Sequence, residues 1–113
     1  MPTELRRIVF TNDELRQALS NQRVEGRPVI PFGQIQSANF LEESRAELLI
    51  KIYDHSSDKH HEAVLSSTVV AAALMSYCIV QRVPLPRSAR KSIAISGDNV
   101  ALDLRSDGKA EPG

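Results

Sequence analysis

Residues 58–83 read DKHHEAVLSSTVVAAALMSYCIVQRV and contain the longest regular hydrophobic pattern of the chain. We predict a single helix from Asp58 to Val83, with Asp58 as its N-cap. Glu62 would lie in the first turn, where a carboxylate interacts favourably with the helix dipole. Apolar and small side chains cover more than half of the circumference of this helix. A helix of that kind lies at the centre of a fold or is shared between two subunits.

The apolar helix gives the first functional prediction. A few short strands cannot cover so much apolar surface, and an exposed remainder would mark an interface. We therefore predict a homodimer or a subunit that binds an unknown protein partner. Residues 63–80 carry no charge, but several hydroxyl side chains lower the hydropathy of this span, so no membrane association is expected. The candidate interface residues are Leu65, Val69, Ala72, Ser76 and Ile79.

A hairpin is predicted immediately upstream. The segment AELLIKIYD, residues 46–54, alternates between apolar and polar side chains, which indicates a strand. We expect it to pair with a weaker strand-like pattern at residues 34–41. The good helix formers in EESRAELL leave a rival interpretation open, namely a helix from Leu41 to Ile52.

At the N-terminal side the pattern predicts a strand followed by a helix. The strand covers Arg6 to Phe10. Thr11 can cap the helix, and Glu14 stands three residues later, as a capping box requires. The helix should end before Gly26, and residues 24–34 are rich in Gly and Pro and are predicted to form a loop.

The C-terminal part contains one element with two possible structures. After the prolines at positions 84 and 86, residues 87–95 can form a short helix or a strand, and we favour the helix slightly. Residues 100–105 alternate and are predicted to form the last strand, which residues 97–99 would connect to a strand at 87–95. Residues 106–113 are polar and are predicted to be a disordered tail.

The predicted order is strand, helix, strand, strand, helix, strand. This is the ferredoxin-like βαββαβ order, so we predict an α+β fold, a two-layer sandwich with one antiparallel sheet and both helices on one face. The long apolar second helix and an extra short element before the last strand are additions to this plan. The chain has 113 residues, of which 42% are hydrophobic and 4% aromatic, so one domain over residues 1–105 with an aliphatic core is expected.

Composition and motifs argue against several classes of function. Fourteen basic and fourteen acidic residues cancel, so no overall field attracts nucleic acid. The chain has one cysteine, Cys78, and therefore no intrachain disulfide. There is no GxSxG, Walker or GxGxxG motif, and the central aromatic pair of RNA-recognition domains is missing. These features favour a non-enzymatic protein without a cofactor, and the missing signal-peptide pattern favours a cytoplasmic location.

One polar segment leaves a metal site open as an alternative. Residues 54–62 read DHSSDKHHE and contain all three histidines. Asp54, Asp58 and His61 could bind a metal ion if they converged. The simpler interpretation is a polar loop whose acidic residues cap the next helix.

A basic segment leaves a second alternative open. No acidic residue occurs between Glu62 and Asp98. If residues 87–95 are helical, the last three cations of this span would share one face and could bind an anion or a nucleic-acid backbone. The simpler interpretation is a turn with a basic rim. The candidate anion-binding residues are Arg82, Arg87, Arg90 and Lys91.

The stretch VPLPRSARKSIAISGDNVALDL, residues 83–104, resembles a segment of a family of small, uncharacterised bacterial proteins. In that family an apolar helix ends at a Pro-Leu-Pro turn, which basic residues, a Lys-Ser pair, a Gly-Asp pair and a final apolar strand follow. The similarity extends from Tyr77 to Leu104. It implies a bacterial cytoplasmic protein, and it implies no activity and no site residues.

Overall fold

The computed structural model describes residues 4–41 and 45–106 of the chain. Within these ranges the fold is mixed α+β, with two helices, two three-stranded antiparallel sheets and one two-stranded hairpin. The elements in chain order are β1 (Glu4–Val9), α1 (Asn12–Ser20), β2 (Arg23–Val24), β3 (Arg27–Pro28), β4 (Gln34–Phe40), β5 (Glu47–Asp54), β6 (Lys59–Ser66), α2 (Ser67–Val80), β7 (Arg90–Ser96) and β8 (Asn99–Ser106).

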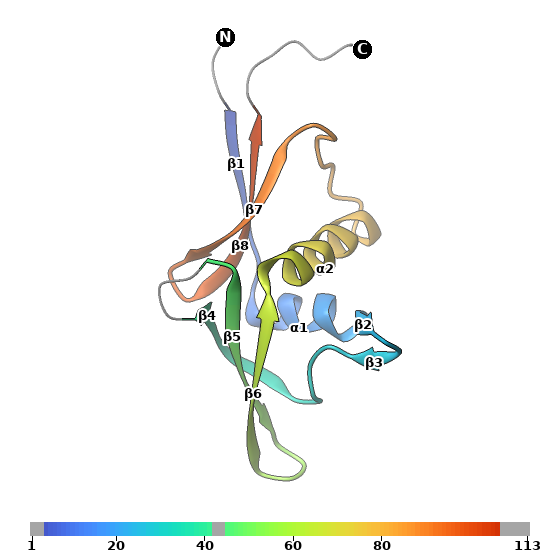
Figure 1. The fold of residues 1–113 in the computed structure, drawn as a ribbon, viewed down its shortest axis with the longest axis vertical. Coiled ribbons are helices and arrows are strands. Elements are labelled where there is room, and N and C mark those ends of the chain that lie inside the picture. The colour runs from blue at the N-terminus through green and yellow to red at the C-terminus, as the bar shows by residue number, and fades with distance from the viewer. Residues whose placement is uncertain (1–3, 42–44, 107–113) are drawn as a thin grey trace.

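The strands are divided between two sheets instead of forming one. The first sheet has the order β1–β8–β7, and the second has the order β4–β5–β6. Figure 1 shows the two sheets one above the other along the long axis, with both helices beside them. The ferredoxin-like arrangement is therefore not confirmed, because it requires the strands of both halves of the chain to pair in one sheet.

Both sheets and both helices share one hydrophobic core. Leu15 of α1, Ile50 of β5, Leu74 of α2 and Leu102 of β8 are fully buried within a single cluster of contacting apolar residues. Its members are largely aliphatic, in agreement with the composition. The core therefore holds together elements from the two ends of the chain.

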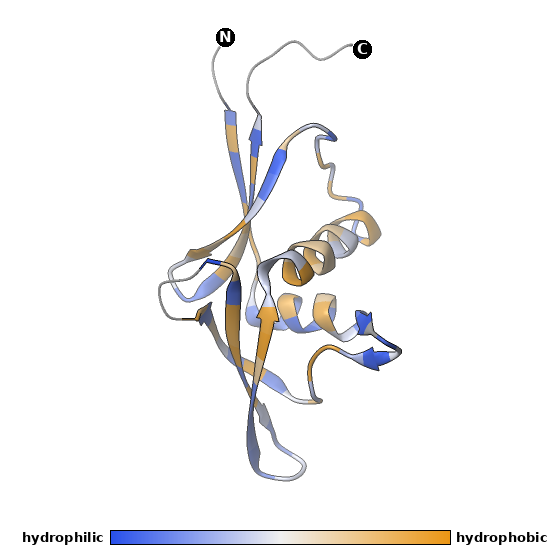
Figure 2. Ribbon diagram, in the orientation of Figure 1, coloured by the Kyte–Doolittle hydropathy of each residue, from blue (hydrophilic) through white to orange (hydrophobic). Residues whose placement is uncertain are grey.

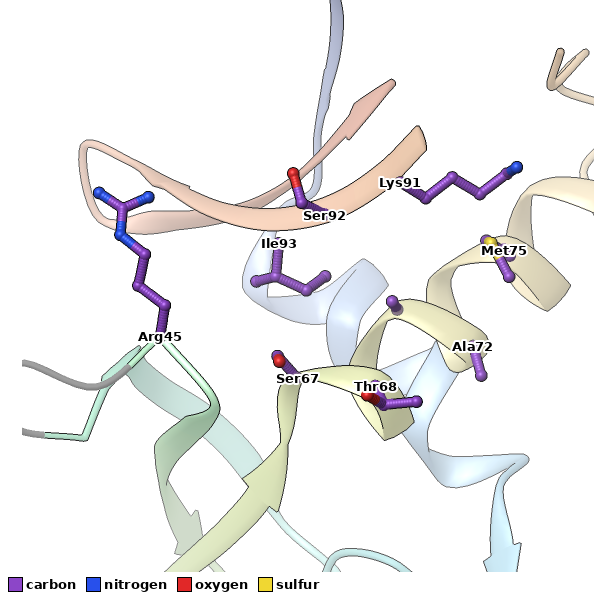
Figure 3. A pocket seen from close by; sticks show the side chains of 9 residues that line it. Arg45, Ser67, Thr68, Ala72, Met75, Lys91, Ser92 and Ile93 are labelled. Atoms are coloured by element: carbon purple, nitrogen blue, oxygen red, sulfur yellow. The ribbon is translucent and has the colours of Figure 1, made fainter. Parts of the chain in front are cut away.

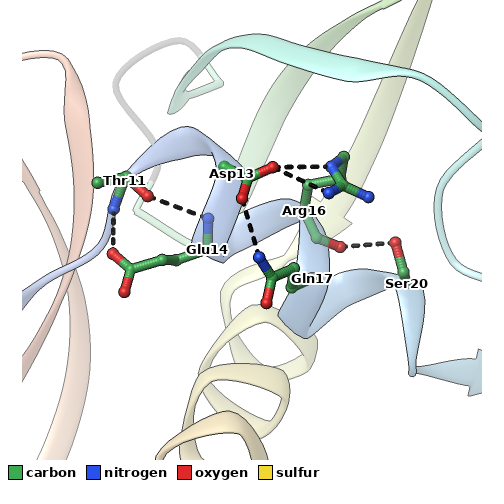
Figure 4. Close-up of polar contacts among 6 residues, drawn as sticks. All are labelled: Thr11, Asp13, Glu14, Arg16, Gln17 and Ser20. Carbon is green, nitrogen blue, oxygen red and sulfur yellow. Dashed lines mark hydrogen bonds and ion pairs between the residues drawn. The ribbon is translucent and has the colours of Figure 1, made fainter.

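The predicted capping box at the start of α1 is confirmed. The Thr11 hydroxyl accepts a hydrogen bond from the Glu14 backbone N–H at 3.1 Å, and the Glu14 carboxylate accepts one from the Thr11 backbone N–H at 2.9 Å (Figure 4). Asp13 adds an ion pair with Arg16 at 2.9 Å and accepts a hydrogen bond from Gln17 at 2.8 Å. The two bonds between Thr11 and Glu14 satisfy backbone N–H groups that an uncapped helix start leaves unpaired.

The predicted hairpin upstream of α2 is also confirmed, and the rival helix from Leu41 to Ile52 is wrong. Strand β4 pairs with β5 from Gln34 opposite Tyr53 to Phe40 opposite Leu48, with one irregularity at Gln36. The alternation of β5 places Leu48, Ile50 and Ile52 in the core. Burial of this face outweighs the helix propensity of the residues before it.

The prediction of one helix from Asp58 to Val83 is wrong in its first third. Residues Lys59–Ser66 form strand β6, which pairs with β5 over its whole length. Asp58 has a backbone φ of +53° in the tight turn between the two strands, so it does not cap a helix. The N-cap is Ser66, whose hydroxyl accepts a hydrogen bond from the Val69 backbone N–H at 3.2 Å. Pairing with a neighbouring strand decides the structure of this segment.

The slight preference for a helix at residues 87–95 is wrong as well. Residues Arg90–Ser96 form strand β7, and a two-residue turn with Gly97 at φ +60° connects it to β8. Glycine at the first central position suits this turn, because it tolerates a positive φ. Strand β8 continues through Ser106, one residue beyond the predicted strand end, and the remainder of the predicted tail lies outside the described residues.

Candidate functional site

The three candidate metal ligands do not converge. The Asp54 carboxylate accepts hydrogen bonds from Ser56 and Ser57, so it closes the turn after β5. Asp58 accepts a hydrogen bond from the Tyr53 hydroxyl, and His61 lies on β6 opposite Ile52. Among the described residues no group of three or more side chains is arranged to hold a metal ion.

The hydrogen bonds of this hairpin end change two pKa values. The Ser56 hydroxyl and backbone N–H lower the pKa of the Asp54 carboxyl, since they stabilise its charged form. The hydrogen bond to Asp58 raises the pKa of Tyr53, because it stabilises the protonated phenol. The Tyr53 ring also contacts the rings of His55 and His60, with centroid distances of 4.5 Å and 4.7 Å. The segment is thus an ordered, exposed hairpin end.

The candidate anion-binding residues are also separated. They lie in two turns and one strand: Arg82 follows α2, Arg87 lies in the turn before β7, and within β7 Arg90 lies opposite Arg105 while Lys91 lies opposite Leu104. Neighbouring residues of a strand point to opposite faces of the sheet, so these two cations cannot share one face. Arg82 is exposed in the segment after α2, with φ at +60°. The helical premise of that prediction is therefore wrong, and anion binding stays a prediction.

The candidate interface residues lie on the outward side of α2 and at the end of β6. The buried side of α2 consists of Val70, Ala73, Leu74 and Cys78. Burial raises the pKa of the Cys78 thiol. The predicted stripe occupies other positions: Leu65 and Val69 are half-buried, Ala72 and Ser76 are exposed, and Ile79 is 71% exposed.

A groove of about 430 Å³ separates α2 from strand β7 (Figure 3). The helix contributes Thr68, Ala71 and Met75, which succeed one another on one side of α2. Strand β7 contributes Lys91 and Ile93 together with the residue between them. This volume lies within the range of small-ligand pockets.

The groove also has a polar end. Arg45 stands before β5, and its guanidinium carbon lies 5.7 Å from the centre of the Phe40 ring. The Ser67 backbone N–H donates a hydrogen bond to the carbonyl oxygen of Ala46 at 2.8 Å, which places the first turn of α2 beside Arg45. The Arg45 cation and the hydroxyl groups of Ser67 and Thr68 therefore lie where the helix begins, whereas Lys91 lies beside Met75, further along the helix (Figure 3).

Of the residues that line this groove, the sequence singled out Lys91 and Ala72 as site residues and missed Arg45, Met75 and Ile93. The missed residues come from segments that are far apart in the chain. No local motif connects them, because the groove exists only once β7 is placed beside α2. The signals available were the basic character of the segment around Lys91 and the helical stripe that contains Ala72.

Comparison of the chain with protein-family models, with curated proteins and with solved structures found no match. Within residues 4–41 and 45–106, no helix is long and apolar enough to cross a membrane. The resemblance of residues 83–104 to a bacterial family stays a prediction.

Proposed function

We propose that the protein is a non-enzymatic interaction domain that forms a homodimer through the outward side of helix α2. The observation that carries this proposal is the absence of any charged residue from Ser67 to Val80. A helix without a charged side is normally buried all round. Here Ile79 and Val80 are 71% and 75% exposed in the single chain, and Figure 2 shows no strongly hydrophilic residue on α2.

The spacing of the outward residues favours a second α2 as the partner. Val69, Ala72, Ser76 and Ile79 follow one another at intervals of three, four and three residues. This is the interval pattern of helices that pack along one seam. The small side chains of Ala72 and Ser76 permit a close approach of two helix backbones. Because the seam carries no charge, two copies meet without electrostatic repulsion.

Sedimentation velocity at micromolar concentration tests the proposal. We expect a dimer for the natural chain and a monomer for Ile79→Asp, since the substitution places two carboxylates in the seam. Val64→Asp is the matched control, because Val64 is 48% exposed on β6, outside the seam. The control should remain a dimer. A natural chain that sediments as a monomer at about 50 µM would refute the proposal.

A further inference from the structure

Strand β7 has a free edge in the part of the chain that the structure describes. It pairs with β8, and no other described strand lies on its other side. The turn that connects the two strands contains two residues, and Ser96 faces Asn99 across it. In such a hairpin the pair that flanks the turn exchanges both backbone hydrogen bonds. Bonded and non-bonded pairs then alternate along the strands.

This alternation determines which backbone groups of β7 point away from β8. Counting back from Ser96, every second residue bonds to β8, and Ser92 is one of these. Lys91 and Ile93 occupy the intervening positions, so their N–H and C=O groups point toward the free edge. No described residue provides a backbone partner for these groups. A row of such groups is a template for one more strand.

The groove between α2 and β7 runs along this edge. Three consecutive residues of β7, from Lys91 to Ile93, line it, although consecutive side chains of a strand point to opposite faces. A surface that contacts all three must therefore approach the strand from its edge. The opposite wall is the side of α2 that carries Ala71 and Met75. Figure 3 shows Met75 on this wall. A strand added to β7 would place every second side chain against this apolar wall.

The charge of the groove indicates the chemistry of the added strand. Its ionisable lining residues are the cations Arg45 and Lys91, and no described carboxylate lines it. The Lys91 ammonium donates a hydrogen bond to the Ala89 carbonyl at 3.0 Å, which holds the cation beside the edge. The guanidinium carbon of Arg45 lies 5.7 Å from the centre of the Phe40 ring, and the N–H groups of a guanidinium are suited to a carboxylate.

We propose that the α2–β7 groove binds an extended peptide with alternating apolar and acidic residues. The peptide adds as a strand to the free edge of β7. Its backbone bonds to Lys91 and Ile93, its apolar side chains contact Ala71 and Met75, and an acidic side chain pairs with Arg45. The groove adjoins the proposed dimer seam at Ala72, which lines the groove as well, whereas Ser76 and Ile79 of the seam lie outside the groove.

Fluorescence anisotropy with two labelled octapeptides tests the proposal. One probe alternates valine and aspartate, and the other alternates valine and lysine. We expect the protein to bind the acidic probe at least about tenfold more tightly than the basic one at low salt. Arg45→Glu should remove or reverse this preference. Equal binding of both probes, or no binding of either, overturns the proposal.

Proline substitutions test the strand addition itself. Lys91→Pro removes an edge N–H that does not bond to β8, so the fold should survive while affinity for the acidic probe falls about tenfold or more. Lys91→Gln removes only the charge and should lose less affinity for the acidic probe than Lys91→Pro does. Ser92→Pro removes a ladder hydrogen bond and should instead lower thermal stability. If Lys91→Pro binds the acidic probe as well as Lys91→Gln does, strand addition is excluded.

The dimer variant separates the two proposals. Ile79→Asp should bind the acidic probe with unchanged affinity, because the groove lies toward the other end of α2. A dimer that Lys91→Pro dissociates and Ile79→Asp leaves intact would mean that the edge of β7 pairs with a second copy. That result would overturn both the peptide proposal and the α2 seam.

Discussion

At the scale of single residues, Gly33, in the loop before β4, lies in close contact with strand β5. An added Cβ at this position would lie 2.6 Å from the Ile52 side chain and 2.7 Å from the Tyr53 carbonyl oxygen. Its φ of +148° is also a conformation that other residues rarely adopt. The backbone of β5 is fixed by two neighbouring strands, so the obstruction cannot be relieved by a small shift.

We therefore expect Gly33→Ala to destabilise the protein by about 3 kcal/mol or more, as the sum of overpacking and backbone strain. Urea unfolding would measure this difference. Gly97→Ala is the matched control, because Gly97 has φ +60° and nothing lies within 4 Å of its added Cβ. The control should lose only about 1 kcal/mol from backbone strain. Equal losses in both variants would show that the contact with β5 is not as close as described.

At the scale of elements, the boundary between β6 and α2 follows from Ser66. Its hydroxyl accepts the Val69 N–H, and the Ser67 N–H is paired with Ala46. We expect Ser66→Ala to destabilise the protein by about 1 kcal/mol, whereas Ser66→Asp, which keeps an acceptor at the cap, should retain the stability. Urea unfolding measures both variants. An unchanged stability for Ser66→Ala would place the start of the helix elsewhere.

The same boundary shows what local sequence reasoning can and cannot predict. The cap of α1 was predictable, since Thr11 and Glu14 form a motif that acts within four residues. The start of α2 was not, because residues 59–66 contain no helix-breaking residue. Their strand conformation depends on β5, because their backbone groups pair with those of β5. Figure 2 shows the change along β6 from hydrophilic residues at the hairpin end to apolar residues near α2, which agrees with a strand that enters the core partway along.

The candidate site shows the same limit. The outward stripe of α2 was predictable from its period, because Ala72, Ser76 and Ile79 remain on one side of the helix whether it begins at residue 58 or 67. The groove was not predictable, because it depends on Arg45 and on the open edge of β7. A strand is an edge strand when it has a neighbouring strand on one side only, and the hydrophobic pattern of a strand does not directly indicate whether the second neighbour is present.

At the scale of the whole molecule, the protein is elongated. Its radius of gyration is 15.2 Å, and its dimensions are 53 × 29 × 24 Å. A compact chain of this length would have a radius of about 13 Å. The excess arises because the ends of both sheets extend beyond the shared core (Figure 1). Strand β1, for example, has no fully buried residue.

An elongated molecule with two sheets could unfold in two steps, but the single core argues for one. Leu74 of α2 is fully buried in the cluster that also contains Ile50 of the second sheet and Leu102 of the first. We expect Leu74→Ala to cost about 2–5 kcal/mol and to weaken both sheets together, since the cavity opens at their common support. Leu5→Ala, at a residue that is 63% exposed, should change the stability by no more than about 0.5 kcal/mol.

Hydrogen exchange reports on the two sheets separately. In the natural chain the slowest amides of β5 and β8 should have the same free energy of opening, because both open only when the whole protein unfolds. Leu74→Ala should lower the two values by the same amount. A loss confined to β5 would show that the sheets are separate cooperative units. The first sheet, with the open edge of β7, would then fold without the second, and the groove would depend on how α2 docks between them.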